Sequence, residues 1–166
     1  MQVLQPYSPE WSKKYENESV LITSVIPELI GIEHIGSTSI PGMTSKPVID
    51  IGVLLSTAVD AEKYISPLGS IGYTYFPASS SSERLFFRKG NPVEFHVSLA
   101  FKDRGNFWER QLLFREYLRN HPEAQKEYIR IKVESLEHDP TGGKVYLSGK
   151  NTFVERILLE ARTGIE

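Results

Sequence analysis

The chain has 166 residues, a length typical of one domain, and residues 1–166 are interpreted as a single domain. A net charge of −2 argues against a general affinity for nucleic acid, so extended nucleic acid is not an expected partner. No cysteine is present, which excludes disulfides and thiolate ligands. No signal-peptide pattern and no membrane-spanning apolar run are found, so a cytoplasmic protein without a membrane partner is expected.

The first two thirds of the chain predict a mixed sheet with flanking helices. Ser8, Pro9 and Glu10 form a helix-start signal, and this helix is expected to run to about Ile26. A second helix is predicted over 60–69. Apolar segments bounded by turn residues predict strands over 30–37, 46–55, 73–77, 84–89 and 92–101.

The pattern becomes helical from Asn106 onward. A helix over about 107–120 is followed by a second that starts at His121-Pro122-Glu123, and by a third over about 144–162. The layout is therefore α+β, with a sheet-containing part over about 1–103 and a C-terminal three-helix portion over about 104–166.

A hydroxyl-rich turn, Gly36-Ser37-Thr38-Ser39, follows the first predicted strand. Glycine permits a sharp turn and a close ligand approach, and the amides and hydroxyls that follow it suit a phosphate site. An ordinary strand-to-helix turn explains the same residues, and this interpretation stays open. The segment matches neither the Walker A pattern nor GxGxxG, so neither common nucleotide-binding loop is indicated.

Two strands carry polar residues that an apolar strand does not need. Asp50 lies in an apolar run, where an ionised carboxylate is costly unless it meets a cation or hydrogen-bond donors. Strand alternation places Glu94 and His96 on one face, and this pair suits a divalent ion or general acid–base chemistry. A structural salt bridge at Asp50 and a solvent-facing strand at Glu94 and His96 are the alternatives.

Two basic residues of the helical part are candidates for anion contacts. Lys150 falls within the apolar stripe that contains Tyr146, Phe153 and Ile157, so it must snorkel, pair with an acid or point into a polar cleft. A phosphate-binding role would explain its position. Arg115 lies at the edge of its helix's apolar stripe and suits a buried ion pair or an anion contact.

Taken together, these features resemble the nucleotidyltransferase superfamily of the polymerase-beta type. The segments "EHIGSTSIPGMTSKPVIDI" (33–51) and "LLFREYLRNHPEAQKEY" (112–128) are more specifically similar to the GrpB family (UPF0157-type), a branch of that superfamily. The resemblance implies a nucleotidyltransferase-type sheet with a C-terminal helical part. It places Gly36 and Ser37 at the glycine–serine position, Asp50 at the first carboxylate and Glu94 near the third.

The chain departs from the superfamily pattern at Gly52, where the second carboxylate is expected. Nucleotidyl transfer commonly uses two metal ions, which two carboxylates on alternate residues of one strand would bridge. Asp50, Glu94 and His96 are predicted to hold one ion, Mg²⁺ or Mn²⁺, and the histidine favours Mn²⁺.

The prediction is a nucleotide-binding protein of nucleotidyltransferase fold, with metal-dependent nucleotidyl transfer to an unknown acceptor as its candidate activity. Asp50, Glu94 and His96 are assigned to catalysis and the metal, and they are expected to share one cleft with Ser37. The residues assigned to the phosphates of a nucleoside triphosphate are Gly36, Ser37, Thr38, Lys46, Arg115 and Lys150. The alternative, which Gly52 favours, is a non-catalytic module that binds a nucleotide or coenzyme as a sensor, or binds a partner protein.

Overall fold

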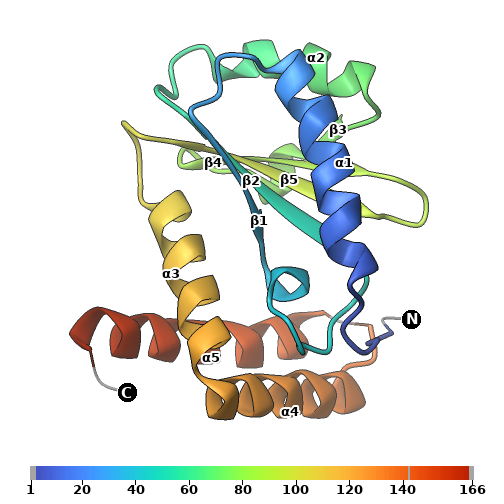
Figure 1. Cartoon of the computed structure of the whole chain (residues 1–166), viewed down its shortest axis with the longest axis vertical. Coiled ribbons are helices and arrows are strands. Elements are labelled where there is room, and N and C mark those ends of the chain that lie inside the picture. The colour runs from blue at the N-terminus through green and yellow to red at the C-terminus, as the bar shows by residue number, and fades with distance from the viewer. Residues whose placement is uncertain (1–2, 142, 165–166) are drawn as a thin grey trace.

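A computed structural model of the chain describes residues 3–141 and 143–164, with the backbone alone over 144–146. It contains a five-stranded mixed sheet and five α-helices (Figure 1), and it confirms the predicted α+β fold class. The strands are β1 (Gly31–Ile35), β2 (Ile49–Leu55), β3 (Thr74–Tyr75), β4 (Arg84–Lys89) and β5 (Phe95–Phe101). The α-helices are α1 (Glu10–Val25), α2 (Ile65–Ser70), α3 (Phe107–Asn120), α4 (Pro122–His138) and α5 (Lys144–Thr163).

The strand order is β1-β2-β5-β4-β3, with β2 and β5 parallel and the other neighbours antiparallel. Asp50 of β2 lies beside His96 of β5, and His96 lies beside Arg88 of β4. Because residues in register point to the same side of a sheet, these three side chains leave one face in a row. The opposite face carries the apolar residues of the same strands.

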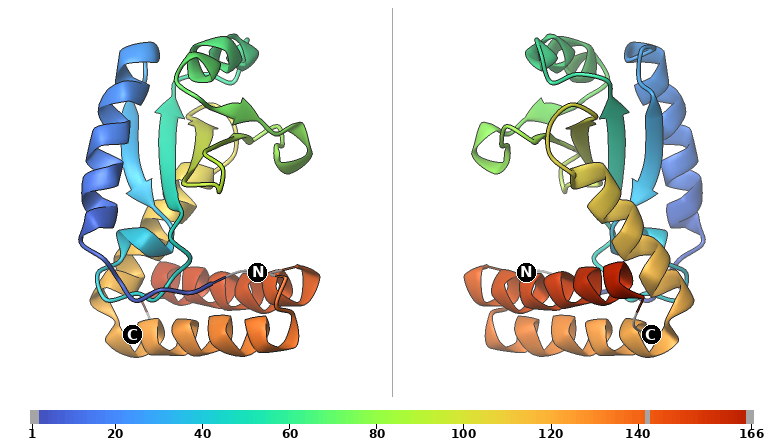
Figure 2. Two further views of the ribbon diagram at one scale, coloured as in Figure 1. Left: turned by 90° about the vertical axis from the view of Figure 1, so that its right-hand side faces the viewer. Right: turned by 90° about the vertical axis from the view of Figure 1, so that its left-hand side faces the viewer.

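That apolar face packs under α1 and α2. Ile49, Ile51 and Val53 of β2 are fully buried there, together with Val97 and Leu99 of β5. The polar face lies toward the C-terminal helices, which Figure 2 shows as a platform of α4 and α5 beneath the end of the sheet, joined to it by α3. In β2 and β5, alternate side chains therefore point into the apolar core and toward the polar face, as strand alternation predicts.

A second apolar core fixes the helical platform to the loop after β1. Ile40 and Met43 of that loop are buried against residues of α3, α4 and α5. Phe114 packs edge-on against the rings of Tyr128 and Phe153, which stack on each other at 4.7 Å. The platform and the loop therefore form one packed unit beside the sheet's polar face.

Several predicted elements differ in extent, and the strands expected over 46–55 and 73–77 cover only Ile49–Leu55 and Thr74–Tyr75. The strand expected over 92–101 begins at Phe95, so Glu94 belongs to the turn between β4 and β5. The helix expected over 60–69 begins as a 3₁₀ turn over Ala61–Tyr64 and becomes α-helical at Ile65. In the described ranges, no helix combines the length and the hydropathy needed to cross a bilayer.

Candidate functional site

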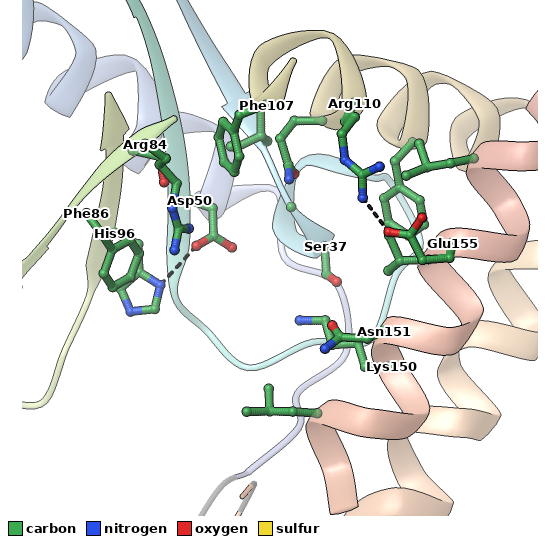
Figure 3. Close-up of a pocket in the computed structure, with 18 of the residues that line it drawn as sticks. Ser37, Asp50, Arg84, Phe86, His96, Phe107, Arg110, Lys150, Asn151 and Glu155 are labelled. Atoms are coloured by element: carbon green, nitrogen blue, oxygen red, sulfur yellow. Dashed lines mark hydrogen bonds and ion pairs between the residues drawn. The ribbon is translucent and has the colours of Figure 1, made fainter. Parts of the chain in front are cut away.

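A cavity of about 530 Å³ lies between the polar face of the sheet and the helical platform. Figure 3 shows side chains from β2, β4 and β5, the loop after β1, α3 and α5 pointing into it. Of the residues proposed from the sequence, those that line it are Gly36, Ser37, Asp50, His96 and Lys150. Segments far apart in the chain thus converge on one pocket.

Gly36 makes the turn that brings the serine-rich loop against Asp50. Its φ of 72° and ψ of −173° fall in a region that is essentially restricted to glycine. A Cβ atom at this position would lie 3.0 Å from the Cβ of Asp50, closer than ordinary packing allows. The loop backbone and the Asp50 side chain therefore touch only because residue 36 has no side chain.

Asp50 and His96 form the polar centre of the sheet's open face. His96 Nδ1 lies 3.0 Å from Asp50 Oδ1, and the imidazole packs edge-on against Phe86 with 4.9 Å between ring centroids. A carboxylate beside Nδ1 favours the tautomer that carries its proton there. The Nε2 atom is then an acceptor, and the pair is suited to orienting a hydroxyl group or a water molecule.

The most buried cation of the site, Lys132 of α4, was not predicted from the sequence. Its Nζ donates to Ser37 Oγ at 2.6 Å and to the Thr44 carbonyl at 3.1 Å, and it lies 4.3 Å from the ring centroid of Tyr128. Only 2% of Lys132 is exposed. A sequence signal existed, because Lys132 stands four residues after Tyr128 and therefore shares its buried helix face.

Lys150 lines the pocket, and the charges of Lys132, Lys46 and Lys150 act on one another. Burial, and then the charges of Lys150 and Lys46, lower the pKa of Lys132 to about 7, while Asp50 acts in the opposite direction. Burial is also the largest cause of a lowered pKa at Lys46, followed by the charge of Lys150. Mutual repulsion among three ammonium groups means that an anion placed between them would be held strongly.

Four residues predicted for the site do not line the pocket: Thr38, Lys46, Glu94 and Arg115. The Thr38 hydroxyl is buried and bonds His34 Nε2 at 2.9 Å, so it holds the loop to β1. Glu94 is 54% exposed at its side chain and pairs with Lys14 of α1 at 3.7 Å. Because it precedes β5, strand alternation does not hold Glu94 on the face of His96. The predicted cleft therefore gathers Ser37, Asp50 and His96, but not Glu94.

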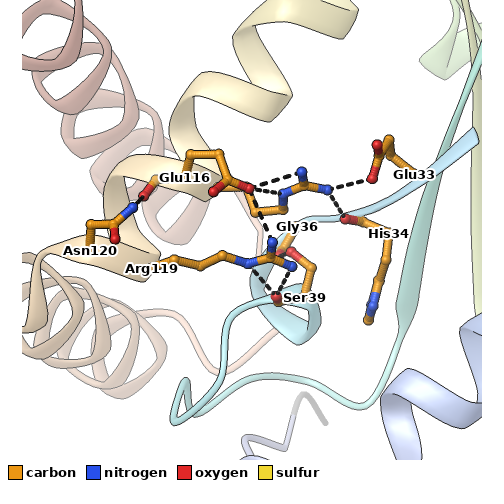
Figure 4. A network of polar contacts seen from close by, with 8 residues as sticks. Glu33, His34, Gly36, Ser39, Glu116, Arg119 and Asn120 are labelled. Atoms are coloured by element: carbon orange, nitrogen blue, oxygen red, sulfur yellow. Dashed lines mark hydrogen bonds and ion pairs between the residues drawn. The ribbon is translucent and has the colours of Figure 1, made fainter. Parts of the chain in front are cut away.

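Arg115 contacts protein groups rather than lining the pocket. Figure 4 shows the polar network around Glu33, Glu116 and Arg119 to which these contacts belong. Arg115 NH1 donates to Glu33 Oε2 and to the His34 carbonyl, both at 2.9 Å. Arg119, one turn later, donates to the Ser39 carbonyl at 2.8 and 3.1 Å. Both guanidinium groups also bond Glu116, so a linked network ties α3 to the two ends of the serine-rich loop.

Replacing Arg115 with methionine is expected to destabilise the protein by about 2 kcal/mol, since three acceptors lose a charged, mostly buried donor. Urea unfolding monitored by circular dichroism measures this change. Arg104→Met, at an exposed arginine, is the control and is expected to change stability by less than about 0.5 kcal/mol. If Arg115→Met weakens nucleotide binding without lowering stability, then the guanidinium serves a ligand and not the loop.

The packing around Gly52 bears on the number of metal ions. A Cβ atom there would lie 3.3 Å from Ile35 Cδ1 and 3.5 Å from Trp108 Cζ3, both apolar groups. A second carboxylate at this position would therefore face a ring and a methyl group. Among the described residues, no group of three or more histidine and acidic side chains is placed to hold a metal. The residues present do not fit a two-ion site.

Comparison with known proteins places this geometry in a family. The sequence profile described as GrpB protein matches residues 2–160. The UPF0157 protein PA4798 of Pseudomonas aeruginosa is 36% identical over 163 residues, which cover 92% of this chain and 64% of that relative. The chain thus spans slightly less than two thirds of this relative's length.

Solved structures agree with this family assignment and show the same fold. The conserved protein GrpB from Enterococcus faecalis superposes with a TM-score of 0.88 at 29% identity, over 98% of each chain. The Cid1 poly(U) polymerase, in a structure titled as bound to Mg and 3′-dATP, superposes with a TM-score of 0.59 at 11% identity, over 88% of this chain and 49% of that one. The second likeness supports a nucleotidyltransferase-type fold alone.

Proposed function

This chain belongs to the GrpB family, and from that premise we propose that its pocket binds a nucleoside triphosphate through the phosphates. The carrying observation is that Lys132 donates to Ser37 Oγ and Lys150 lines the same pocket, while the charge of Lys46 acts on Lys132. Three ammonium groups around one hydroxyl and one carboxylate suit a polyphosphate. The likeness to the Cid1 structure with 3′-dATP bound supports the choice of ligand class.

The remaining parts of the pocket suit the other parts of such a ligand. Phe86, Phe107 and Val154 supply apolar surface beside the polar groups. A sugar and base are less polar than a triphosphate, so they would lie against this apolar wall while the phosphates meet the lysines. The cavity of about 530 Å³ falls in the range of small-molecule sites.

Nucleotidyl transfer with one divalent ion is the second candidate, because Asp50 and His96 lie together at the pocket's edge. Mg²⁺ is commonly held by one or two carboxylates together with substrate phosphates, so Asp50 fits one ion brought with the nucleotide. Such an ion, Mg²⁺ or Mn²⁺, would neutralise phosphate charge. His96 would accept a proton from an acceptor hydroxyl, oriented for this by Asp50.

Calorimetric titration of ATP into the protein, with and without Mn²⁺, tests the binding proposal. Lys150→Met keeps most of the side-chain volume and removes the charge. It is expected to weaken binding by about 1.5–3 kcal/mol, the range for a hydrogen bond to a charged group. Lys126→Met is the matched control, because Lys126 is 75% exposed on α4 and pairs only with Glu123 among the described residues.

Equal ATP affinity in the wild type and in Lys150→Met would contradict a phosphate site at the lysines. Pyrophosphate release in the presence of Mn²⁺ distinguishes transfer from binding alone. A protein that binds ATP but releases no pyrophosphate would be the non-catalytic sensor that Gly52 favours.

A further inference from the structure

A series of alternating aromatic rings and guanidinium groups runs from the pocket along β4, with Phe107 of α3 at one end and Phe76 at the other. The guanidinium of Arg84 lies between the rings of Phe107 and Phe86, with its central carbon 5.3 and 4.7 Å from their centroids. The guanidinium of Arg88 continues the series, at 5.6 Å from Phe86 and 4.5 Å from Phe76. Cation–π contacts of this length fix the guanidinium planes without using their N–H donors.

The two arginines of this series differ in their hydrogen bonds. Arg84 NH2 donates to the Ser79 carbonyl at 2.7 Å. The Arg88 side chain, in contrast, makes no hydrogen bond or ion pair within residues 3–141 and 143–164, and its Nε atom is buried without an acceptor. A buried donor without a partner costs about 1–3 kcal/mol. A guanidinium held by aromatic rings, with its donors unused, is suited to a planar contact with an oxyanion.

The position of Arg88 relates it to the site already described. Arg88 is in register with His96, and His96 is in register with Asp50, so the three form a row across the sheet. Figure 3 shows Ser37 and Lys150 on the opposite side of Asp50 from His96. The lysines and Arg88 are therefore two separate cationic positions, with the Asp50–His96 pair between them.

We propose that Arg88 forms a second anion subsite, which binds the phosphate of a phosphate monoester such as a nucleoside 5′-monophosphate. The pairing of this ligand with a triphosphate in the pocket rests on the proposed function. Two phosphorylated ligands repel each other, so their simultaneous binding requires cations at separate positions. Separate lysine and arginine positions on either side of Asp50 and His96 meet that requirement. The monoester is then the acceptor, or its analogue, beside His96.

Titration of uridine 5′-monophosphate and, separately, inorganic phosphate into ¹⁵N-labelled protein tests the subsite. Both are titrated in the absence of triphosphate, and the monophosphate again in the presence of a non-hydrolysable ATP analogue. Saturable shifts at the amides of 84–89 are expected, and Arg88→Met is expected to weaken this binding at least tenfold. Arg130→Met, at an exposed arginine of α4, is the control and should leave the affinity unchanged. Thermal unfolding verifies that each variant is folded.

The outcomes separate the two proposals. Loss of monophosphate binding in Arg88→Met, with unchanged affinity for the ATP analogue, supports the subsite. If the wild type binds no triphosphate, loss of monophosphate binding in Arg88→Met still supports the subsite. Equal binding of inorganic phosphate and the monophosphate supports a subsite that recognises the phosphate group alone. Monophosphate binding that is lost in Lys150→Met and retained in Arg88→Met would overturn the subsite, because the ligand would then occupy the pocket.

Discussion

Replacing Gly36 with alanine is expected to destabilise the protein by about 2–4 kcal/mol, through backbone strain and a clash that add together. The strain arises because φ is 72° and ψ is −173°, a conformation that a residue with a side chain avoids. The clash arises because the new methyl group would lie 3.0 Å from the Cβ and the Cγ of Asp50. Denaturant unfolding measures the sum.

Gly42→Ala provides a matched control. Its φ of 85° is also in the region that favours glycine, but the nearest heavy atom to a new Cβ is Gln125 Oε1 at 3.7 Å. Alanine at residue 42 therefore adds backbone strain without a clash, and the expected loss is about 1 kcal/mol. The difference between the two variants measures the contact between the loop and Asp50. Equal losses would show that Asp50 moves aside freely, so that residue 36 does not set its position.

The parts of the site that were predictable are those governed by local periodicity. Strand alternation put His96 on a polar face, and Asp50 stood out as a carboxylate in an apolar strand. The parallel pairing of β2 with β5 brings the two side chains together. Gly36 was predictable as a turn because only glycine tolerates its conformation. The α+β arrangement followed in the same way, from the change of apolar period near Asn106.

The parts that sequence reasoning missed depend on tertiary neighbours. Glu94 alternates with His96 in the sequence, but its strand begins one residue later and its carboxylate pairs with Lys14 on the other side of the sheet. Arg115 was assigned to the phosphates, but the buried ion pair that its position suited equally is what forms, with Glu33 and the His34 carbonyl as acceptors. A charged residue on a buried stripe indicates that a partner exists, and not which partner it is.

Lys132 also depends on tertiary neighbours. Its replacement is expected to change how the stability of the protein and its affinity for ATP depend on pH. The unfolded chain holds this lysine near its ordinary pKa of 10.5, whereas burial lowers the folded value to about 7. Between those values the unfolded state binds one more proton than the folded state. Stability therefore rises with pH through this window, and the destabilising effect of the buried charge is complete only below about pH 7.

In Lys132→Met this proton is absent from both states. The free energy of unfolding of the wild type, relative to the variant, is expected to rise by about 1.4 kcal/mol per pH unit above pH 7, and by about 2–3 kcal/mol between pH 7 and 9. Urea unfolding of both proteins at half-unit intervals measures the difference. Lys126→Met, which removes an exposed ammonium group from the same helix, should follow the wild type at every pH.

Ligand binding should show the opposite pH dependence, because a bound phosphate stabilises the ammonium form of Lys132 and raises its pKa. The affinity of the wild type for ATP is expected to fall as the pH rises above 7, because the free protein loses a proton that the complex retains. The decrease approaches about tenfold per pH unit. Lys132→Met should bind ATP more weakly at pH 6.5 and lack this part of the pH dependence. A constant difference in stability and in affinity across pH 6–9 would show that Lys132 stays charged in its buried position. Ser37, the Thr44 carbonyl and Tyr128 would then be sufficient to hold the ammonium group, and no anion would be needed to complete the site.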